Sequence, residues 1–418
     1  MISKIHKKPL SIFVKNILIM FRGTVISQVV AILGSLYLAK LYGTNAYGIF
    51  GVFMSITSIF SIVNTLQLEK NIVTAKTISK SKNWYRFLTI GSPLIASFFL
   101  LIFYGLYTAD LFENVGNTVV FWSFLGSVFV ALFIVNESFF IYRKKFKLLS
   151  NSKVLLTFVN VVLQSILFYK YQFYGLVYGY VISQCIIVIF FYVNNLKYIG
   201  FPKQEGIKND LRVNSTIIKF LLPGNTINAL AIHLMPIFIA AFFNKEQAGI
   251  YFFVTKLLTA PLFLISSSVS QVYFQKASEL YHSKRSDILN MTTKIMKGNL
   301  LIMILILALI NTIGMYFLEW YLDSEWENIR LFTLILSFLI LARTSFNPIS
   351  SLIIILNKNH VSLWFNIYLF LVNIIAIYIG YTNMDITITI MILSLFGGIG
   401  YLVLLLYFLK LLKNLKDV

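Results

Sequence analysis

Apolar segments of roughly 20 residues, separated by short polar stretches, run along the whole chain, and each is long enough to cross the hydrocarbon core of a bilayer as an α-helix. The pattern predicts twelve membrane-spanning helices, at residues 16–39, 46–68, 86–107, 117–141, 153–169, 173–195, 215–243, 247–274, 295–318, 329–356, 360–380 and 385–409. We therefore expect an all-α membrane protein with about 12 transmembrane helices.

The charged residues between these segments are distributed unevenly, and the asymmetry predicts the orientation of the chain. Of the 35 lysines and arginines, 28 fall on the side that carries both termini and the even-numbered connections. The opposite side has only four, together with eight acidic residues. Because cytoplasmic loops carry an excess of Lys and Arg, both termini are expected in the cytoplasm. The net charge of +20 follows from these loops, so it does not indicate a nucleic-acid partner.

Composition and motifs narrow the class of protein further. A chain of 418 residues that is 58% hydrophobic, with a mean hydropathy of +0.82, is not a soluble domain. The single cysteine, Cys185, excludes a disulfide framework. The sequence contains no zinc-protease, paired-cysteine, phosphate-loop or nucleophile-elbow motif. We therefore expect no metal, no cofactor and no enzymatic activity.

The two halves of the chain align without a gap at an offset of 201 residues, which places Gly23 on Gly224 and Gly48 on Gly249. Six helices in each half give both halves the same orientation in the membrane, which is a parallel repeat. The pattern predicts two six-helix bundles, residues 1–200 and 201–418, around a central cavity. Transporters use such pairs to expose one cavity alternately to each side of the membrane.

Arg343 is the most informative of three cations that fall inside predicted helices. A charge at the centre of a membrane helix costs about 2.5–3.5 kcal/mol on insertion scales, so it needs a partner or a cavity. At helical spacing Arg343 shares a face with Asn347, Ser350 and Asn357. This polar stripe favours a cavity over a buried structural partner.

The other two cations, Lys256 and Arg22, are less clear-cut. Lys256 shares its helix face with small and polar residues, a pattern that fits either a cavity or close packing of a neighbouring helix. Arg22 lies about two turns from the expected cytoplasmic end, on an otherwise apolar face. It either faces the cavity or extends to the lipid headgroups.

The remaining polar residues within or next to the predicted helices allow two interpretations each. Glu69 and Glu137 either pair with a loop lysine or bind a coupling proton or sodium ion. His233 stands alone among apolar residues and is better explained as a core histidine. Six amides either contact sugar hydroxyls or join helices to each other: Gln28, Asn64, Asn225, Asn228, Gln164 and Gln184.

Five short stretches match the pattern of one known family: Gly23–Gln28, Leu38–Tyr42, Tyr47–Phe50, Gln67–Ile72 and Ala248–Tyr251. On these residues the chain resembles the bacterial polysaccharide-biosynthesis (O-antigen) flippases of the multidrug/oligosaccharidyl-lipid/polysaccharide exporter superfamily. It departs from the pattern where Gln67-Leu68 replaces Arg-Tyr before Glu69, and where Lys256 and Lys40 replace arginine. Lysine keeps the charge but loses the bidentate geometry that arginine offers to phosphate.

The resemblance implies a MATE-like fold and a flippase that works by alternating access. Its substrate would be an undecaprenyl-diphosphate-linked oligosaccharide, a unit of O-antigen (lipopolysaccharide), capsule or a similar polymer. The flippase would move this unit from the inner to the outer leaflet of the bacterial cytoplasmic membrane. A polysaccharide polymerase and a chain-length regulator would be partners. The candidates for binding the diphosphate or an acidic sugar are Arg343, Lys256, Arg22 and Lys40.

Three other functions remain open from the sequence. One is a flippase for lipid-linked peptidoglycan precursor or teichoic acid units, which the sequence does not separate from a flippase for O-antigen or capsule units. A drug or cation antiporter of the same fold would need buried carboxylates, whereas the charges inside the predicted helices are basic. A membrane polysaccharide polymerase would be expected to show a large external loop or a histidine–carboxylate pair, and neither is visible.

Overall fold

The computed structural model describes residues 12–107, 116–203, 222–283 and 285–414, and these residues form helices and turns without any strand. Ten segments among them are long and apolar enough to cross a membrane. Two of the ten, Ile19–Thr65 and Phe146–Tyr198, are long enough to cross twice. Each of the twelve predicted crossings therefore has a counterpart, which confirms an all-α membrane protein.

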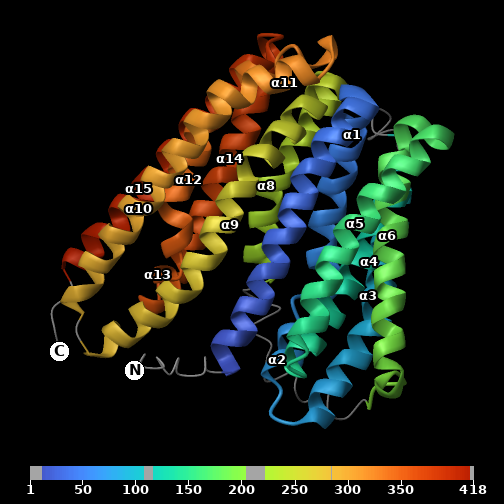
Figure 1. The fold of residues 1–418 in the computed structure, drawn as a ribbon, viewed down its shortest axis with the longest axis vertical. Helices are drawn as coiled ribbons and strands as arrows, with labels where there is room; N and C mark the ends of the chain where they lie inside the picture. The colour runs from blue at the N-terminus through green and yellow to red at the C-terminus, as the bar shows by residue number, and fades with distance from the viewer. Residues whose placement is uncertain (1–11, 108–115, 204–221, 284, 415–418) are drawn as a thin grey trace, which may run out of the picture.

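The first half of the chain forms one group of helices (Figure 1): α1 (Ile12–Thr65), α2 (Lys70–Thr74), α3 (Ile78–Tyr107), α4 (Asn117–Tyr142), α5 (Phe146–Tyr171) and α6 (Gly175–Asn195). The long α1 consists of two helices that reverse direction at Gly43, whose backbone has φ 72° and ψ −179°. The reversal brings the hydroxyl of Tyr47 to the carbonyl oxygen of Ser35, to which it donates a hydrogen bond of 2.7 Å. Only glycine adopts such a backbone conformation without strain.

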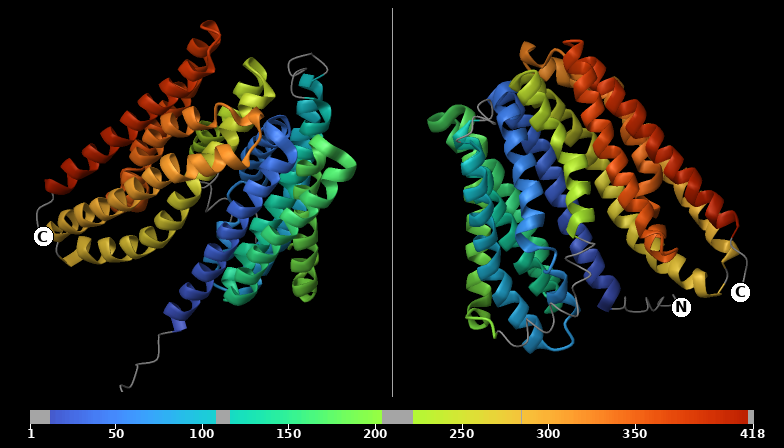
Figure 2. Two further views of the ribbon diagram at one scale, coloured as in Figure 1. Left: turned by 45° about the horizontal axis from the view of Figure 1, so that its top comes forward. Right: turned by 180° about the vertical axis from the view of Figure 1, so that it is seen from behind.

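The second half forms another group: α8 (Leu222–Phe242), α9 (Lys245–Ser283), α10 (Ser286–Leu309), α11 (Met315–Tyr321), α12 (Ile329–Phe346), α13 (Leu352–Ile355), α14 (Asn359–Thr382) and α15 (Ile386–Lys413). The two groups meet chiefly where α1 packs against α8 and α9. Figure 1 and both views in Figure 2 show the groups close together at one end and diverging toward the other. The predicted division at residue 200 remains a prediction.

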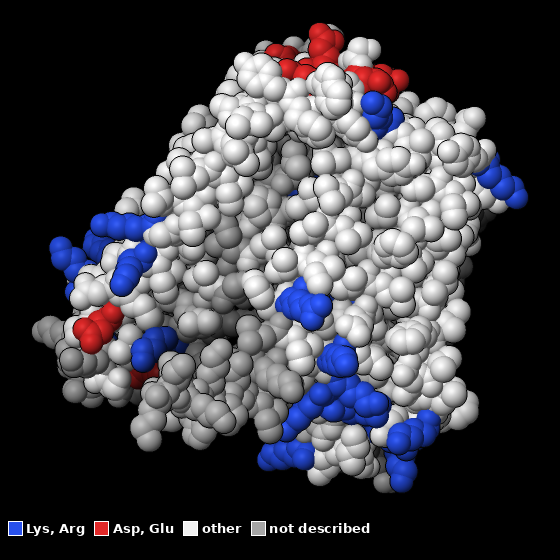
Figure 3. Space-filling model, viewed as in Figure 1, with Lys and Arg blue, Asp and Glu red and all other residues white. Residues whose placement is uncertain are grey.

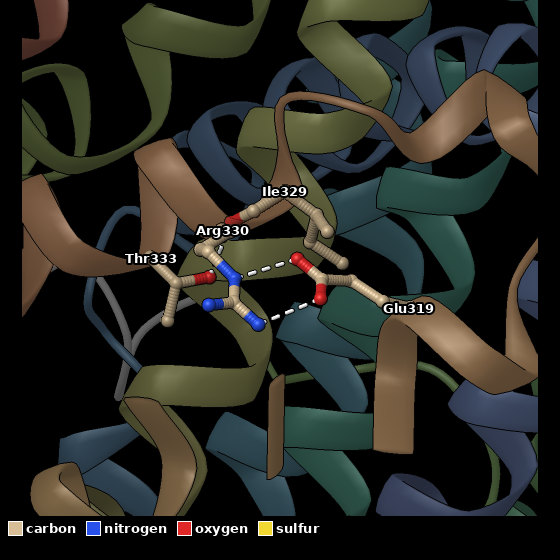
Figure 4. Close-up of polar contacts among 4 residues, drawn as sticks. All are labelled: Glu319, Ile329, Arg330 and Thr333. Carbon is tan, nitrogen blue, oxygen red and sulfur yellow. Dashed lines mark hydrogen bonds and ion pairs between the residues drawn. The ribbon is translucent and has the colours of Figure 1, made fainter. Parts of the chain in front are cut away.

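The two ends of the molecule differ in charge. We call the end where α1 begins and α15 finishes the basic end, and the opposite end, which includes the connection between α11 and α12, the acidic end. Figure 3 shows a group of acidic side chains at the acidic end, and most lysines and arginines, with a few acidic side chains, toward the basic end. Arg330, at the acidic end, is neutralised by two 2.6 Å hydrogen bonds to Glu319 (Figure 4).

The two groups are held together at the acidic end by a pair of equivalent contacts. A Cβ atom at Gly48 would collide with the backbone carbonyl of Lys245, and one at Gly249 would collide with that of Thr44. The offset of 201 residues converts the first contact into the second, so the two halves use the same surface for each other. Contacts of this kind are expected where two similar units are related by a two-fold axis.

Aromatic side chains close the same end of the interface. The ring of Tyr47 lies 5.6 Å from that of Phe253 and 5.7 Å from that of Trp326, measured between centroids. All three side chains are almost completely buried within a cluster of apolar residues that spans both groups. Edge-to-face pairs of this kind contribute about 0.5–1.5 kcal/mol each beyond area burial. The acidic end is therefore packed shut.

Several helices are longer than the hydropathy pattern predicted, at the basic end. α9 continues to Ser283 and α10 begins at Ser286, whereas the predicted segments were 247–274 and 295–318. The additional turns carry charged residues, which a hydropathy window excludes although they do not end a helix. The prediction was right for the crossings and wrong for the helix lengths.

One predicted helix is broken inside the membrane. α12 ends at Phe346, and the chain passes through a short 3₁₀ turn, Asn347–Ile349, before α13. Pro348 causes the break because it lacks a backbone N–H and disfavours helix at the preceding residue. The predicted stripe from Arg343 to Asn357 along one continuous helix is therefore wrong.

Candidate functional site

A central cavity of about 470 Å³ lies between the two groups of helices. The first group lines it with α1, α5 and α6, and the second with α8, α9, α12, α14 and α15. Figure 3 shows the surface hollowed between the two groups on the face drawn there. A cavity of this size is within the range of sites for small molecules, roughly 300–1,000 Å³.

The two strongest cationic candidates from the sequence, Lys256 of α9 and Arg343 of α12, line this same cavity. Counted from Lys245 and Ile329, where their helices begin at the acidic end, they lie about 17 and 21 Å along the helix axis at 1.5 Å per residue. Because the hydrocarbon core is about 30 Å thick, both charges lie well inside the membrane. Two helices far apart in sequence thus bring their cations to one site.

Among the residues described here, nothing in the cavity lining carries a negative charge that would balance these cations. None of the described residues that line it is an aspartate or a glutamate. Within the described part of the chain, the Nε of Arg343 is buried and has no hydrogen-bond partner. Because burying an unpaired charged group is unfavourable, the site is suited to an anionic ligand that supplies the missing acceptor.

The break in α12 helps to hold Arg343 in place. Arg343 lies in the last turn of α12, and the backbone N–H of Asn347 donates to its carbonyl. The last carbonyls of a helix carry a partial negative charge, which stabilises a cation in that turn. The helix therefore ends inside the membrane at the point where its dipole favours the guanidinium, an arrangement known from ion sites in transporters.

The first group lines its side of the cavity with neutral polar side chains. Asn160 of α5 and Gln184 of α6 face it together with Tyr180. Ser183 donates a hydrogen bond of 3.3 Å to the Oδ1 of Asn160, while the Oε1 of Gln184 is buried without a partner among the described residues. Amides both donate and accept hydrogen bonds, as sugar hydroxyls require. The two cations thus come from the second half, and the first half contributes amides opposite to them.

His233 of α8 was predicted to be a core histidine, and this interpretation was wrong. Its side chain is only half-buried and lines the cavity on the same wall as Lys256 and Arg343. Asn373 of α14 also reaches the cavity and donates a hydrogen bond of 2.6 Å to the carbonyl of Ala231 in α8. Sequence alone does not reveal either position, because the rotation of each helix about its axis depends on packing.

A second cavity of about 370 Å³ continues the central one sideways between α1 and α9. Both cavities share Ala31, Lys256 and Thr259, and the second is also lined by Gln28 and Phe263. Phe263 has half of its side-chain surface exposed, at 51%. The central cavity therefore has a lateral branch beside an exposed apolar side chain on the flank of the bundle.

The other two cationic candidates lie away from the central cavity. Arg22 is exposed in a groove between α1 and α5 at the basic end. Lys40 is exposed near the acidic end, with its Nζ 4.6 Å from the centre of the Tyr321 ring. Binding of substrate by either residue stays a prediction without support from this geometry.

Most of the amide candidates also lie outside the central cavity. Asn64 is buried within the first group and donates to the Oγ of Ser127 at 2.9 Å. Asn225 donates to the Oε1 of Gln67 at 2.8 Å and so joins the two groups. Asn228 of α8 is half-buried but is not among the residues that line the cavity. Gln164 donates to the carbonyl of Leu176 within the first group. Of the six candidates, Gln184 lines the cavity and Gln28 approaches it through the lateral branch.

The two carboxylates that were candidates for a coupling ion have different surroundings. Glu137 of α4 forms an ion pair of 2.6 Å with Lys153 of α5. Glu69 is buried in the turn before α2, and its Oε2 has no partner among the described residues. Burial raises the pKa of Glu69 above its ordinary value. Neither carboxylate lines the central cavity, and their role in coupling stays a prediction.

The described residues include no group of three or more His, Cys, Asp or Glu side chains that would hold a metal ion. A comparison with curated proteins gives no match. Among solved structures, the chain is similar to the lipid II flippase MurJ in an inward closed conformation, with a TM-score of 0.74 and 15% identity over 96% of this chain and 94% of that one.

Two further solved structures are similar along nearly the full length. An inward-facing multidrug resistance MATE family transporter of the MOP superfamily has a TM-score of 0.68 and 13% identity, over 93% of this chain and 96% of that one. A MOP superfamily transporter from Pyrococcus furiosus has a TM-score of 0.58 and 15% identity, over 97% of each chain. At these identities the likeness establishes the fold, which is that of MOP superfamily transporters.

The comparison with protein families identifies the sequence more directly. The model of the family described as polysaccharide biosynthesis protein matches residues 37–330. This range is more than half of the chain and includes Lys256, the contact between Gly48 and Gly249, and most of the helices that line the cavity. The chain therefore belongs to the polysaccharide biosynthesis protein family, and its fold is similar to those of a solved MOP superfamily transporter and of the flippase MurJ.

Proposed function

We propose that this protein is a flippase for undecaprenyl-diphosphate-linked oligosaccharides in the bacterial cytoplasmic membrane. The observation that carries the proposal is that Lys256 and Arg343 line one cavity inside the membrane whose described lining has no carboxylate. A diphosphate loses hydration when it enters a membrane, and cations in a polar cavity replace the lost interactions through charge-assisted hydrogen bonds. The family supports a lipid-linked polysaccharide precursor as substrate.

The distribution of side chains in the two cavities supports one way for such a substrate to bind. The diphosphate contacts Lys256 and Arg343 on the wall formed by α9 and α12, and the first sugars contact Asn160 and Gln184 on the opposite wall. The polyprenyl chain stays in the bilayer and passes between α1 and α9 through the lateral branch, which Lys256 shares with the central cavity. In this arrangement the anionic diphosphate meets cations, the sugar hydroxyls meet amides, and the apolar polyprenyl chain meets the lateral opening toward the bilayer.

Transport follows from alternating access. By the distribution of lysine and arginine the basic end is cytoplasmic, so both termini face the cytoplasm and the acidic end faces outward. The Gly48 and Gly249 contacts and the buried aromatic rings close the outward end in this structure. Release to the outer leaflet requires these contacts to separate while the basic ends of the two groups approach each other.

The protein itself performs no bond chemistry in this proposal. It delivers complete units to the outer leaflet, where a polysaccharide polymerase and a chain-length regulator assemble O-antigen, capsule or a related polymer. Removal of product by the polymerase then favours export.

The proposal is tested by analysis of lipids from a deletion strain. Undecaprenyl-diphosphate carrying one complete oligosaccharide unit should accumulate in the inner leaflet, while surface polysaccharide disappears. Leaflet location is assigned by whether an impermeant sugar-oxidising or lectin probe, added to intact spheroplasts, reaches the unit. The wild-type gene should restore export, and the gene with Arg343→Ala should not.

Two other outcomes would replace the proposal. Single units that reach the outer leaflet without polymerisation would indicate a polymerase. An unchanged lipid pool combined with altered drug sensitivity would indicate a drug or cation antiporter. The absence of carboxylates among the described residues of the cavity argues against the antiporter, because a cationic drug needs a negative partner.

A further inference from the structure

A third cavity, of about 1270 Å³, lies at the basic end between α1, the start of α5 and α6. Four cations line it: Arg22, Lys144, Lys145 and Lys147. No carboxylate is among its described lining residues. This groove, which we call the basic groove, is separate from the central cavity, and the two share no residue.

The basic groove is amphipathic along its length. Its cations are at the basic end, while Ile26 and Val30 of α1 and Leu155 and Phe158 of α5 continue it toward the middle of the membrane. Three of these apolar side chains are well exposed, and Phe158 has 57% of its surface exposed. Arg22, Ile26 and Val30 lie on successive turns of one helix face, so the apolar strip extends along the helix axis to about 12 Å beyond the position of Arg22.

Close contact between α1 and α5 fixes this arrangement. A Cβ atom at Gly23 would collide with Ser150, and the hydroxyl of Ser150 donates a hydrogen bond of 2.8 Å to the carbonyl of Ile19. Further along, Gly34 allows an equally close approach of Val161. Because the two helices are locked at two points, the cations and the apolar strip keep a constant relative position.

The four cations differ from other basic residues nearby because none has an ion pair within the described part of the chain. By contrast, Lys153 pairs with Glu137, and the side chain of Arg86 donates to the carbonyls of Tyr198 and Ile199. Like charges gathered without counter-ions repel each other, so a bound anion would stabilise the groove. Basic pockets beside membrane helices on the cytoplasmic side are suited to anionic lipid headgroups.

We propose that the basic groove is a binding site for an anionic glycerophospholipid. The phosphate of the headgroup contacts Arg22 and the lysines at the start of α5, and one acyl chain lies along Ile26, Leu155 and Phe158. The combination of cations and an exposed apolar strip favours a lipid over a soluble phosphate, which would leave the strip uncovered. This site is independent of the substrate of the central cavity.

The test uses the full-length protein in nanodiscs of phosphatidylcholine with increasing phosphatidylglycerol, and bound lipids are counted by native mass spectrometry. The triple variant Arg22→Gln/Lys145→Gln/Lys147→Gln should lose phosphatidylglycerol affinity roughly tenfold or more, because each cation near the surface contributes about 1 kcal/mol. The matched control, Lys297→Gln/Lys410→Gln/Lys413→Gln, removes three exposed basic-end charges that do not line the groove. It should change the affinity by less than about twofold, because its charges are outside the site.

Other results would overturn the proposal. Equal losses in both triple variants would mean that the attraction is a diffuse effect of net charge. Equal binding of phosphatidylcholine, or of glycerol 3-phosphate, would exclude a site for an anionic lipid. Preferential binding of undecaprenyl phosphate would make the groove part of the substrate route. Thermal unfolding in pure phosphatidylcholine checks that both variants are folded, and Arg22→Lys, which keeps the charge, should retain binding.

Discussion

Gly48 and Gly249, which are 201 residues apart in the sequence, each pack against the backbone of the other's half at the acidic end of the molecule. Gly48 lies against the carbonyl of Lys245, and Gly249 lies against that of Thr44. A methyl group at either position has no space because the obstructing atom belongs to the backbone. The close approach of the two halves therefore depends on both glycines.

Gly48→Ala should weaken closure of the acidic end and shift the protein toward an outward-open state. Thr157 lines the cavity, so a Thr157→Cys reporter in a Cys185→Ser background should react several times faster with an impermeant thiol reagent added from outside. Gly298→Ala is the control, because nothing lies within 4 Å of the added Cβ in α10. An unchanged labelling rate in a stable Gly48→Ala protein would show that the glycine contact does not control access.

Arg343→Ala should reduce export of lipid-linked oligosaccharide by roughly 10- to 100-fold, because hydrogen bonds to a charged group contribute about 1.5–3 kcal/mol each. Its abundance should stay normal, since the change removes an unpaired buried charge. Arg330→Ala is the matched control in the same helix, because Arg330 pairs with Glu319 at the acidic end and does not line the cavity. Export is measured as surface polysaccharide in a complemented deletion strain. Normal export by Arg343→Ala would remove this residue from the mechanism.

Gln184→Leu should affect recognition of the sugar without affecting the diphosphate. A neutral hydrogen bond contributes about 0.5–1.5 kcal/mol to the binding free energy, so its loss should lower the affinity for undecaprenyl-diphosphate-oligosaccharide about three- to tenfold. Affinity for undecaprenyl diphosphate without sugar should be unchanged. Asn228→Leu serves as the comparison, because Asn228 was a sequence-based candidate that does not line the cavity. If Asn228→Leu lowered the affinity and Gln184→Leu did not, the assignment of the amide wall would be wrong.

Glu69→Gln should make the folded protein more stable at neutral pH. Burial raises the pKa of Glu69, so the folded state disfavours the charged form that the unfolded state accepts. The contribution of Glu69 to the free energy of unfolding is therefore fully present when the pH is below the pKa that Glu69 has in the unfolded chain. It is lost as the pH rises through the higher pKa that Glu69 has in the folded protein. The two proteins should unfold at the same temperature in acid and diverge toward neutrality, as measured by thermal unfolding in detergent. Glu137→Gln, which breaks an ion pair with Lys153, should show no such gain.

Hydropathy and charge were sufficient to predict the membrane crossings and to single out Lys256 and Arg343 as candidates for a cavity. Lys256 and Arg343 stood out because a charge inside an apolar segment is unfavourable without a compensating site, and both indeed line the central cavity. The repeat was visible because Gly48 and Gly249 coincide at the offset of 201, and the structure shows what these glycines do.

The remaining residues of the candidate site depend on packing that the sequence does not encode locally. Asn64 and Gln184 are both amides within membrane helices, yet one joins two helices and the other faces the cavity. The difference comes from the rotation of each helix against its neighbours. The position of Arg22 also depends on helix rotation. The close contact between Gly23 of α1 and Ser150 of α5 turns the face of α1 that carries Arg22 toward the basic groove, which lies outside the central cavity.

The lack of a carboxylate among the described residues of the central cavity has an electrical consequence. Lys256 and Arg343 are fixed in the protein and do not travel with the substrate. If no cation is co-transported through Glu69 or Glu137, each cycle of the proposed flippase would therefore carry the negative charge of the diphosphate outward. Moving one elementary charge across the membrane potential changes the free energy by about 2.3 kcal/mol per 100 mV. In a cell whose interior is negative, the voltage itself would then drive the substrate toward the outer leaflet.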